Sequence, residues 1–178
     1  MLYYIHGYMS EPNSTKGTLF NKKLNAKAIK YRDCEPEDLK ITDCLLRIKK
    51  EIENDENAIL IGSSLGGFLA AKITLDNSNV KQIILLNPAI IPLYVDISKI
   101  QGMPQVILTD MQDFRLFENK ISAKINILAG MMDDVVPNKW VEEFAKAQDV
   151  KIRYLDDDHS FSLNLHILPQ IISEILQT

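Results

Sequence analysis

The sequence predicts an α/β fold: a doubly wound sheet of about six mostly parallel strands, with helices on both faces. Short runs of aliphatic and β-branched residues recur along the chain, as in strands buried on both faces of a parallel sheet. Segments with helical spacing or loops separate these runs, which is the alternation typical of α/β proteins. With 178 residues, 46% of them hydrophobic, the chain is long enough to bury one core. We therefore expect a single domain over residues 1–178.

The expected strands are the six runs that are apolar at nearly every position. They lie at residues 2–5, 28–31, 58–61, 82–86, 125–129 and 151–155. The expected helices fall between or after them, at residues 15–25, 38–54, 65–76, 138–147 and 163–177. In the second of these, apolar side chains such as Cys44, Ile48 and Ile52 share one face and charged side chains occupy the other. Parallel strands joined in this way imply right-handed crossovers.

Residues 88–122 interrupt the alternation. This interval holds three of the seven prolines and is far longer than the roughly 2–6 residues of an ordinary connection in an α/β unit. We expect an insertion there, with a short helix near residues 110–119. Two readings stay open: a small lid that lies across a pocket, or a segment that covers the edge of the sheet.

Composition excludes several classes of partner. The 24 acidic and 20 basic residues are mixed, with a net charge of −4 and no basic run, so nucleic acid is not an expected partner. No apolar stretch approaches the roughly 20 residues that span a bilayer, and the first residues do not resemble a signal peptide, which predicts a cytoplasmic protein without a membrane span. The two cysteines, Cys34 and Cys44, are too few for a disulfide framework and are not spaced as metal ligands, so we expect reduced thiols, no metal and no cofactor.

The segment GSSLGG at residues 62–67 follows an expected strand and precedes an expected helix. Gly62, Ser64 and Gly66 match G-x-S-x-G, in which a sharp turn exposes the serine at the carboxyl end of the sheet. Free N–H groups at the start of the helix point to where an oxyanion would form. One alternative is a simple packing turn of small residues between strand and helix. A phosphate-binding loop is a poorer match, because such a loop would end in Lys-Ser or Lys-Thr.

A serine nucleophile needs a base, and the sequence holds three histidines. His166 lies in the terminal amphipathic pattern and His6 follows the first strand, whereas His159 follows the last strand in the loop LDDDHSF, where a base is expected. The acid that orients such a base is expected after an intervening strand, where Asp133 and Asp134 both qualify. The run of aspartates before His159, residues 156–158, is expected to be solvated.

These motifs together resemble the α/β-hydrolase family. The turn GSSLGG, the acid loop GMMDDVVP and the histidine loop DDDHSF occur in that family's order of Ser, Asp and His. The opening YIHGYMSEPNSTKG is similar to the family's HG loop after the first strand of the core. The short chain, this opening and the DHSF near the end resemble the small bacterial esterases of the YqiA-like group (UPF0227), over nearly the whole chain. The implied fold is a minimal α/β hydrolase that lacks the first two strands of the full fold.

The resemblance also implies roles for individual residues. The catalytic residues would be Ser64, Asp133 and His159, with Asp133 preferred over Asp134 because the family's acid loop reads Gly-x-x-Asp-x-x-Val/Leu-Pro. The oxyanion hole would consist of the backbone N–H groups of Tyr8 and Leu65, and the residues at the substrate would be His6, Gly7 and Met131. One departure is Asp157, where family members often have glycine, so the histidine loop is expected to bend less tightly.

The implied activity is hydrolysis of a small-molecule carboxylic ester or thioester through an acyl-enzyme, without a cofactor. Apolar residues that follow the strand at 82–86, with Met131 and Met132 beside the acid, fit either the walls of an acyl pocket or the core. Two alternatives remain. One is a non-catalytic binding or scaffold protein on the same fold, and the other is a different hydrolase with the same triad, such as a C–C bond hydrolase, a perhydrolase or an acyl-CoA thioesterase. No basic cluster is visible for the phosphates of CoA.

Overall fold

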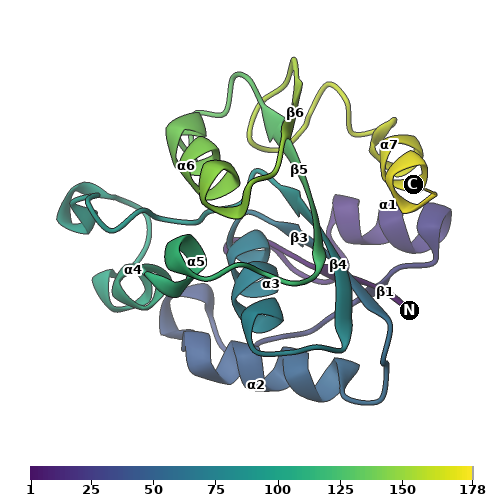
Figure 1. Cartoon of the computed structure of the whole chain (residues 1–178), viewed down its shortest axis with the longest axis horizontal. Helices are drawn as coiled ribbons and strands as arrows, with labels where there is room; N and C mark the ends of the chain where they lie inside the picture. The colour runs from purple at the N-terminus through teal and green to yellow at the C-terminus, as the bar shows by residue number, and fades with distance from the viewer. Residues whose placement is uncertain (178) are drawn as a thin grey trace.

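A computed structural model describes residues 1–177 and contains one open sheet of parallel strands (Figure 1). The strands are β1 (Leu2–Ile5), β2 (Lys27–Ala28), β3 (Ala58–Ser63), β4 (Val80–Leu86), β5 (Lys124–Gly130) and β6 (Ile152–Leu155). Their spatial order is β2-β1-β3-β4-β5-β6, and every neighbouring pair is parallel. The predicted fold class is therefore confirmed. β2 is shorter than expected and ends at Ala28 rather than residue 31.

Helices cover both faces of the sheet, as Figure 1 shows. On one face lie α1 (Thr15–Leu24) and α7 (Leu168–Leu176), which pack against each other. On the other face lie α2 (Ile41–Ile52), α3 (Leu65–Leu75) and α6 (Asn138–Gln148). Two short 3-10 helices, η1 (Pro36–Asp38) and η2 (Ile97–Lys99), lie in the connecting segments.

The strands supply side chains to two separate cores, one on each face. In β4, Ile83 and Leu85 belong to the core under α2, α3 and α6, whereas Ile84 and Leu86 belong to the core under α1 and α7. All four are fully buried. Because helices cover both faces, the central strands β3 and β4 bury side chains on both sides and read as largely apolar runs, whereas Arg153 and Tyr154 of the edge strand β6 are exposed.

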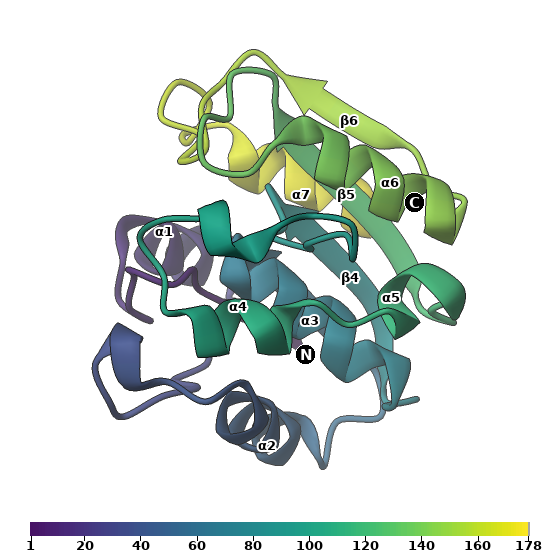
Figure 2. The same ribbon diagram turned by 90° about the vertical axis from the view of Figure 1, so that its left-hand side faces the viewer.

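The interval at 88–122 folds as an insertion with two short helices, α4 (Gln105–Met111) and α5 (Arg115–Glu118). The sequence predicted one helix near 110–119, but the chain breaks at Asp113, whose carboxylate accepts hydrogen bonds from the backbone and the guanidinium of Arg115. In Figure 2 this segment runs in front of α3, and α4 also contacts α2. Its behaviour as a lid stays a prediction.

The last helix starts later than the sequence predicted. α7 begins at Leu168 with Pro169 in its first turn, where a missing N–H costs nothing, instead of at residue 163. The preceding residues, including His166, form turns. None of the helices within residues 1–177 has the length and apolar character needed to cross a membrane.

Candidate active site

Ser64 stands on a strained turn at the carboxyl end of β3. Its backbone has φ 55° and ψ −118°, in the left-handed region that favours glycine, and the next residue starts α3. The turn is tied to the neighbouring strand, because the Ser64 N–H donates to the Leu86 carbonyl over 3.0 Å and the Ala89 N–H donates to the Ser64 carbonyl over 3.0 Å. These backbone hydrogen bonds fix the position of Ser64 at the end of the sheet.

The glycines of this turn permit close backbone contacts. A Cβ atom on Gly66 would overlap the carbonyl oxygen of Ile5 in β1, and one on Gly62 would overlap the carbonyl oxygen of Gly66. Without these side chains α3 begins directly against the ends of β1 and β3. The position of Ser64 therefore depends on small residues on either side of it.

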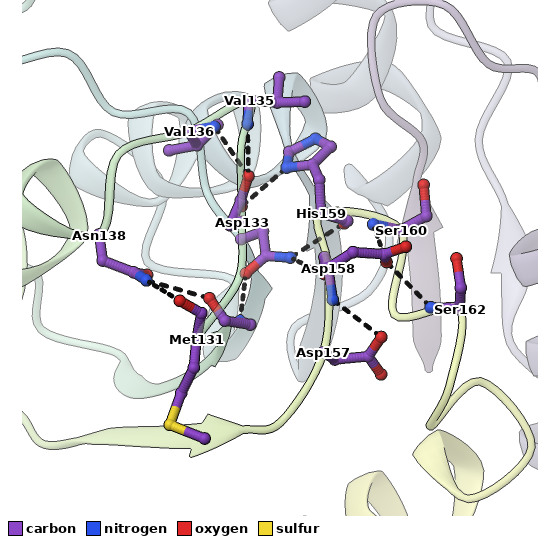
Figure 3. Close-up of polar contacts among 12 residues, drawn as sticks. Met131, Asp133, Val135, Val136, Asn138, Asp157, Asp158, His159, Ser160 and Ser162 are labelled. Carbon is purple, nitrogen blue, oxygen red and sulfur yellow. Dashed lines mark hydrogen bonds and ion pairs between the residues drawn. The ribbon is translucent and has the colours of Figure 1, made fainter.

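The structure brings His159 and Asp133 together (Figure 3). His159 Nδ1 lies 2.8 Å from Asp133 Oδ2. The other oxygen of this carboxylate accepts the N–H groups of Val135 and Val136, over 2.9 Å and 2.8 Å. A carboxylate can only accept, so Nδ1 carries the proton and Nε2 of the neutral ring is left to accept one.

The two aspartates of the acid loop have different surroundings. The side chain of Asp133 is 1% exposed, whereas Asp134 is exposed and borders a separate cavity of about 260 Å³ that also reaches His159. The acid loop is held by Asn138, whose amide donates to the carbonyls of Gly130 and Met131 over 3.0 Å and 3.3 Å (Figure 3).

Ser64 and His159 line one cavity of about 640 Å³. Its apolar wall comes from the 88–122 segment, the acid loop and α6 and includes Ile91, Met103, Leu108, Met111, Val136 and Trp140. Within the described residues, the hydroxyl of Ser64 and the ring of His159 do not share a hydrogen bond, a separation often found in ligand-free catalytic sites.

The two backbone N–H groups that the sequence predicts for an oxyanion hole belong to Tyr8 and Leu65. Among residues 1–177, the amides of Tyr8 and Leu65 donate to no protein group. Leu65 opens α3, so its N–H has no partner inside the helix. Gly7 lies against the serine, because a Cβ on Gly7 would be 3.3 Å from that of Ser64.

Of the three residues expected at the substrate, only Gly7 lines the cavity. His6 is fully buried below it: its Nδ1 lies 2.9 Å from the Gly7 carbonyl, and its ring stacks on Tyr31 with centroids 4.3 Å apart. Burial lowers the pKa of His6, which favours the neutral ring. Met131 is exposed and is not among the residues that line the cavity. His6 therefore supports the loop that carries Gly7, and the role of these residues in binding a substrate stays a prediction.

The sequence profile of the uncharacterised protein family UPF0227 matches residues 1–175. The chain belongs to this family. A comparison of the UPF0227 chain with curated proteins finds no match.

Solved structures with the α/β-hydrolase fold resemble the UPF0227 chain over nearly all of its length. Est1E from Butyrivibrio proteoclasticus is 16% identical with a TM-score of 0.79, and the match covers 99% of this chain and 86% of that one. The ydeN gene product from B. subtilis is 18% identical with a TM-score of 0.72, covering 99% and 98%. Mouse alpha/beta hydrolase domain-containing protein 10 is 17% identical with a TM-score of 0.72, covering 99% and 89%. At these identities the likeness establishes the fold.

Asn87 joins the acid and histidine loops of the UPF0227 chain, and the sequence analysis did not single it out. Its amide nitrogen donates to the carbonyls of Asp158 and His159 over 3.2 Å and 2.9 Å. Its amide oxygen accepts the N–H of Gly130 over 2.7 Å. The side chain is 1% exposed and the backbone has φ 45°. Asn87 therefore fixes both loops relative to the end of β4.

Glycine at position 87 should keep the backbone conformation and remove only these contacts. We expect kcat for an activated ester to fall by up to about 10²-fold, because small misplacements of catalytic groups have effects of this size. Each buried group left unpaired should also cost about 1–3 kcal/mol in the free energy of unfolding. Ester hydrolysis and urea unfolding measure the two effects. Asn25→Gly is the matched control, since Asn25 also has a positive φ of 54° but is an exposed helix cap. Equal effects in the two variants would contradict the role of Asn87.

Asp157 is buried, whereas the sequence analysis expected it to be solvated with its neighbours. Its carboxylate accepts the N–H groups of Asp158, Leu163 and Asn164 and the side-chain amide of Asn164, over 2.8–3.1 Å. Residues on both sides of His159 thus donate to this side chain, and Figure 3 shows the contact from the N–H of Asp158. Burial alone would raise the pKa of Asp157, but the hydrogen bonds from Leu163 and Asn164 outweigh burial and hold the pKa below its ordinary value.

This depressed pKa predicts a pH-dependent contribution to stability. The contribution is fully present above the unfolded pKa near 4, and it is lost as the pH falls through the lower folded pKa. Asp157→Asn should lower the free energy of unfolding by about 2–3 kcal/mol at pH 7, because its new amide group would face N–H donors. Urea titrations at pH 7, 5 and 3 should show the difference from wild type shrinking at the lowest pH. Asp156→Asn, an exposed neighbour, is the control and should match wild type throughout.

In the part of the chain that the structure describes, no three histidine, cysteine, aspartate or glutamate side chains are placed to hold one ion. Cys44 is buried and Cys34 is exposed.

Proposed function

We propose that this chain is a serine hydrolase that cleaves carboxylic esters or thioesters through an acyl-enzyme. The observation that carries this proposal is the 2.8 Å contact between His159 Nδ1 and Asp133 in a cavity that also contains Ser64 on its strained turn. An imidazole oriented in this way has its Nε2 available for a proton. The membership of the chain in UPF0227 and its fold, which it shares with Est1E and other hydrolases, agree with this function.

The reaction has two steps. Ser64 Oγ attacks the carbonyl carbon of the substrate while His159 Nε2 takes the hydroxyl proton. The bond from the carbonyl carbon to the leaving oxygen or sulfur then breaks, and His159 returns the proton to the leaving group. In the second step His159 Nε2 takes a proton from a water molecule, which attacks the acyl carbon. The bond between this carbon and Ser64 Oγ then breaks, His159 returns the proton to Oγ, and the acid is released. Asp133 stabilises the imidazolium that forms in each step.

The developing negative charge needs donors that are already in position. The amides of Tyr8 and Leu65 suit this role because neither donates elsewhere among the described residues. One such donor contributes about 3–4 kcal/mol to the barrier in a serine protease. The hydrogen bond from the Tyr31 hydroxyl to the Gly7 carbonyl, 3.1 Å long, supports the loop that carries one of them.

The cavity suits a substrate of moderate size. A volume of about 640 Å³ is within the range of sites for small molecules, and its largest wall is apolar. A solved structure of Est1E contains ferulic acid, an aromatic acid. By analogy we propose that the acyl or alcohol group of the substrate has an aromatic or aliphatic body, which packs against Trp140 and α4.

A fluorophosphonate probe tests the nucleophile directly. Reaction of the purified protein followed by peptide mass mapping should place one label on the peptide that contains Ser64. The label should disappear in Ser64→Ala and remain in Ser63→Ala, the adjacent serine in β3. A protein that stays unlabelled while fully folded would rule out this function and favour a non-catalytic binding protein, whereas a label on another serine would rule out Ser64 as the nucleophile.

A further inference from the structure

The described lining of the active-site cavity contains one lysine and no carboxylate. Among the described residues that line it, Lys16 is the only lysine or arginine, and none is an aspartate or glutamate. His159 also belongs to this lining, whereas the carboxylates whose fields act on Lys16, those of Asp158, Asp157 and Asp133, do not. A ligand in this cavity would therefore meet the ammonium group of Lys16 on the wall and no carboxylate beside it.

The ammonium group of Lys16 lacks an acceptor. Within residues 1–177 it forms no ion pair or hydrogen bond, and its nearest described partner is the ring of Phe161, whose centroid is 5.9 Å away. The side chain is half-buried. Burial lowers the pKa of Lys16, and the fields of Asp158, Asp157 and Asp133 oppose that shift only in part. An ammonium group removed from water in this way gains free energy from any acceptor that approaches it.

The nearby carboxylates are already occupied by other donors. Asp133 accepts from His159 and two backbone amides, Asp157 accepts from the loop around it, and Asp158 accepts the N–H groups of Ser160 and Ser162 over 2.9 Å and 3.0 Å. None lies within 4 Å of Lys16 Nζ as an ion-pair partner. The lysine thus faces the cavity rather than an internal partner.

Lys16 belongs to a polar side of the cavity, opposite the apolar wall. It lies in the first turn of α1, whose cap is Ser14, and further hydroxyl groups come from Ser10, Thr15, Ser160 and Ser162. The apolar wall comes instead from the 88–122 segment, the acid loop and α6. Figure 2 shows the two sides apart: the 88–122 segment lies in front and α1 behind. Ser64 and His159 complete the lining of the same cavity.

We propose that Lys16 binds a carboxylate group carried by the substrate, so that the preferred esters have an apolar body and one anionic group. This proposal rests on the serine-hydrolase function proposed above. One ammonium group with neighbouring hydroxyls matches one negative charge, whereas phosphate groups are usually held by several cations or by the planar fork of arginine. The carboxylate could belong to the acyl part or to the alcohol part of the ester, because an ammonium group binds either one in the same way.

Two pairs of esters distinguish these sources. The first compares p-nitrophenyl hexanoate with the mono-p-nitrophenyl ester of adipic acid, which ends in a carboxylate instead of a methyl group. The second compares phenyl butyrate with 4-butyryloxybenzoate, in which the alcohol part is charged. In at least one pair, wild type should have the higher kcat/KM for the anionic ester. Lys16→Met should lower the ratio of anionic to neutral kcat/KM by about 10- to 100-fold, and Lys16→Arg should retain most of it.

Controls separate recognition from other roles of the lysine. Lys22→Met removes an exposed charge from the same helix and should leave the ratio unchanged. If Lys16 acts only on stability or on the ionisation of His159, Lys16→Met will change both esters of a pair equally, and that result overturns the proposal. The affinities of the Ser64→Ala variant for the uncleaved anionic and neutral esters measure the same preference independently, without turnover.

The two proposals fail in different ways. Hydrolysis of the neutral esters without a preference for either anionic ester overturns the role of Lys16 and leaves the hydrolase function intact. No hydrolysis of any ester together with no fluorophosphonate label overturns the hydrolase function, and the substrate assignment falls with it.

Discussion

Alanine at position 64 should lower kcat for an activated ester by about 10⁵- to 10⁶-fold, the scale seen when a serine protease loses its nucleophile. The substitution removes one oxygen atom and leaves the cavity, the His159–Asp133 pair and both free amides in place. Burst kinetics with a p-nitrophenyl ester should show no acyl-enzyme in the variant. Turnover close to that of wild type would mean that Ser64 is not the nucleophile.

Glycine at the same position should separate catalysis from stability. The φ of 55° at Ser64 is unfavourable for a residue with a Cβ, and glycine relieves a strain of about 1–3 kcal/mol, offset by its greater freedom in the unfolded chain. We expect Ser64→Gly to be as inactive as Ser64→Ala but more stable than it by about 1 kcal/mol in urea unfolding. A glycine variant less stable than the alanine variant would contradict the idea that the turn stores strain for catalysis.

Asparagine at position 133 should lower kcat by about 10⁴-fold, the effect of the same change in a serine protease. The side chain is 1% exposed and keeps its size, so its oxygen can still accept the N–H groups of Val135 and Val136. Its amide group would then face His159 Nδ1 as a donor, which favours the ring tautomer with the proton on Nε2. That tautomer cannot accept the proton of Ser64.

Asp134→Asn is the matched control for this experiment. Asp134 is adjacent in sequence, exposed, and outside the cavity that contains Ser64. We expect its kcat to stay within about twofold of wild type, since exposed changes away from the site have small effects. Equal losses in the two variants would show that the acid loop as a whole, rather than the carboxylate of Asp133, supports turnover.

The order of elements could be predicted because the central strands bury both faces and therefore read as apolar runs. The same reasoning predicted that loops far apart in the sequence meet at one edge, since parallel strands share their carboxyl ends. The structure brings the loops with Ser64, Asp133 and His159 to that edge. Strand and helix ends were less predictable: nothing in the sequence near residue 163 shows that the chain is still turning there.

The supporting residues could not be found from the sequence, because their roles depend on distant partners. Asn87 makes its contacts with residues 43 to 72 positions away. Three aspartates in a row look solvated, and only the return of the chain at Asn164 encloses Asp157. From the sequence alone, Lys16 is indistinguishable from an ordinary lysine on a helix surface, and only the structure places it in the lining of the cavity. The lining residues Leu108 and Met111 did offer a signal, since they are one helical turn apart in α4.

The pairing of α1 with α7 has a consequence for folding. One face of the sheet is covered by two helices that are far apart in the sequence, so the apolar side chains of this face stay open to water until α7 has docked beside α1. His159 lies between β6 and α7, so the pairing of its imidazole with Asp133 belongs to the same late, long-range step of folding.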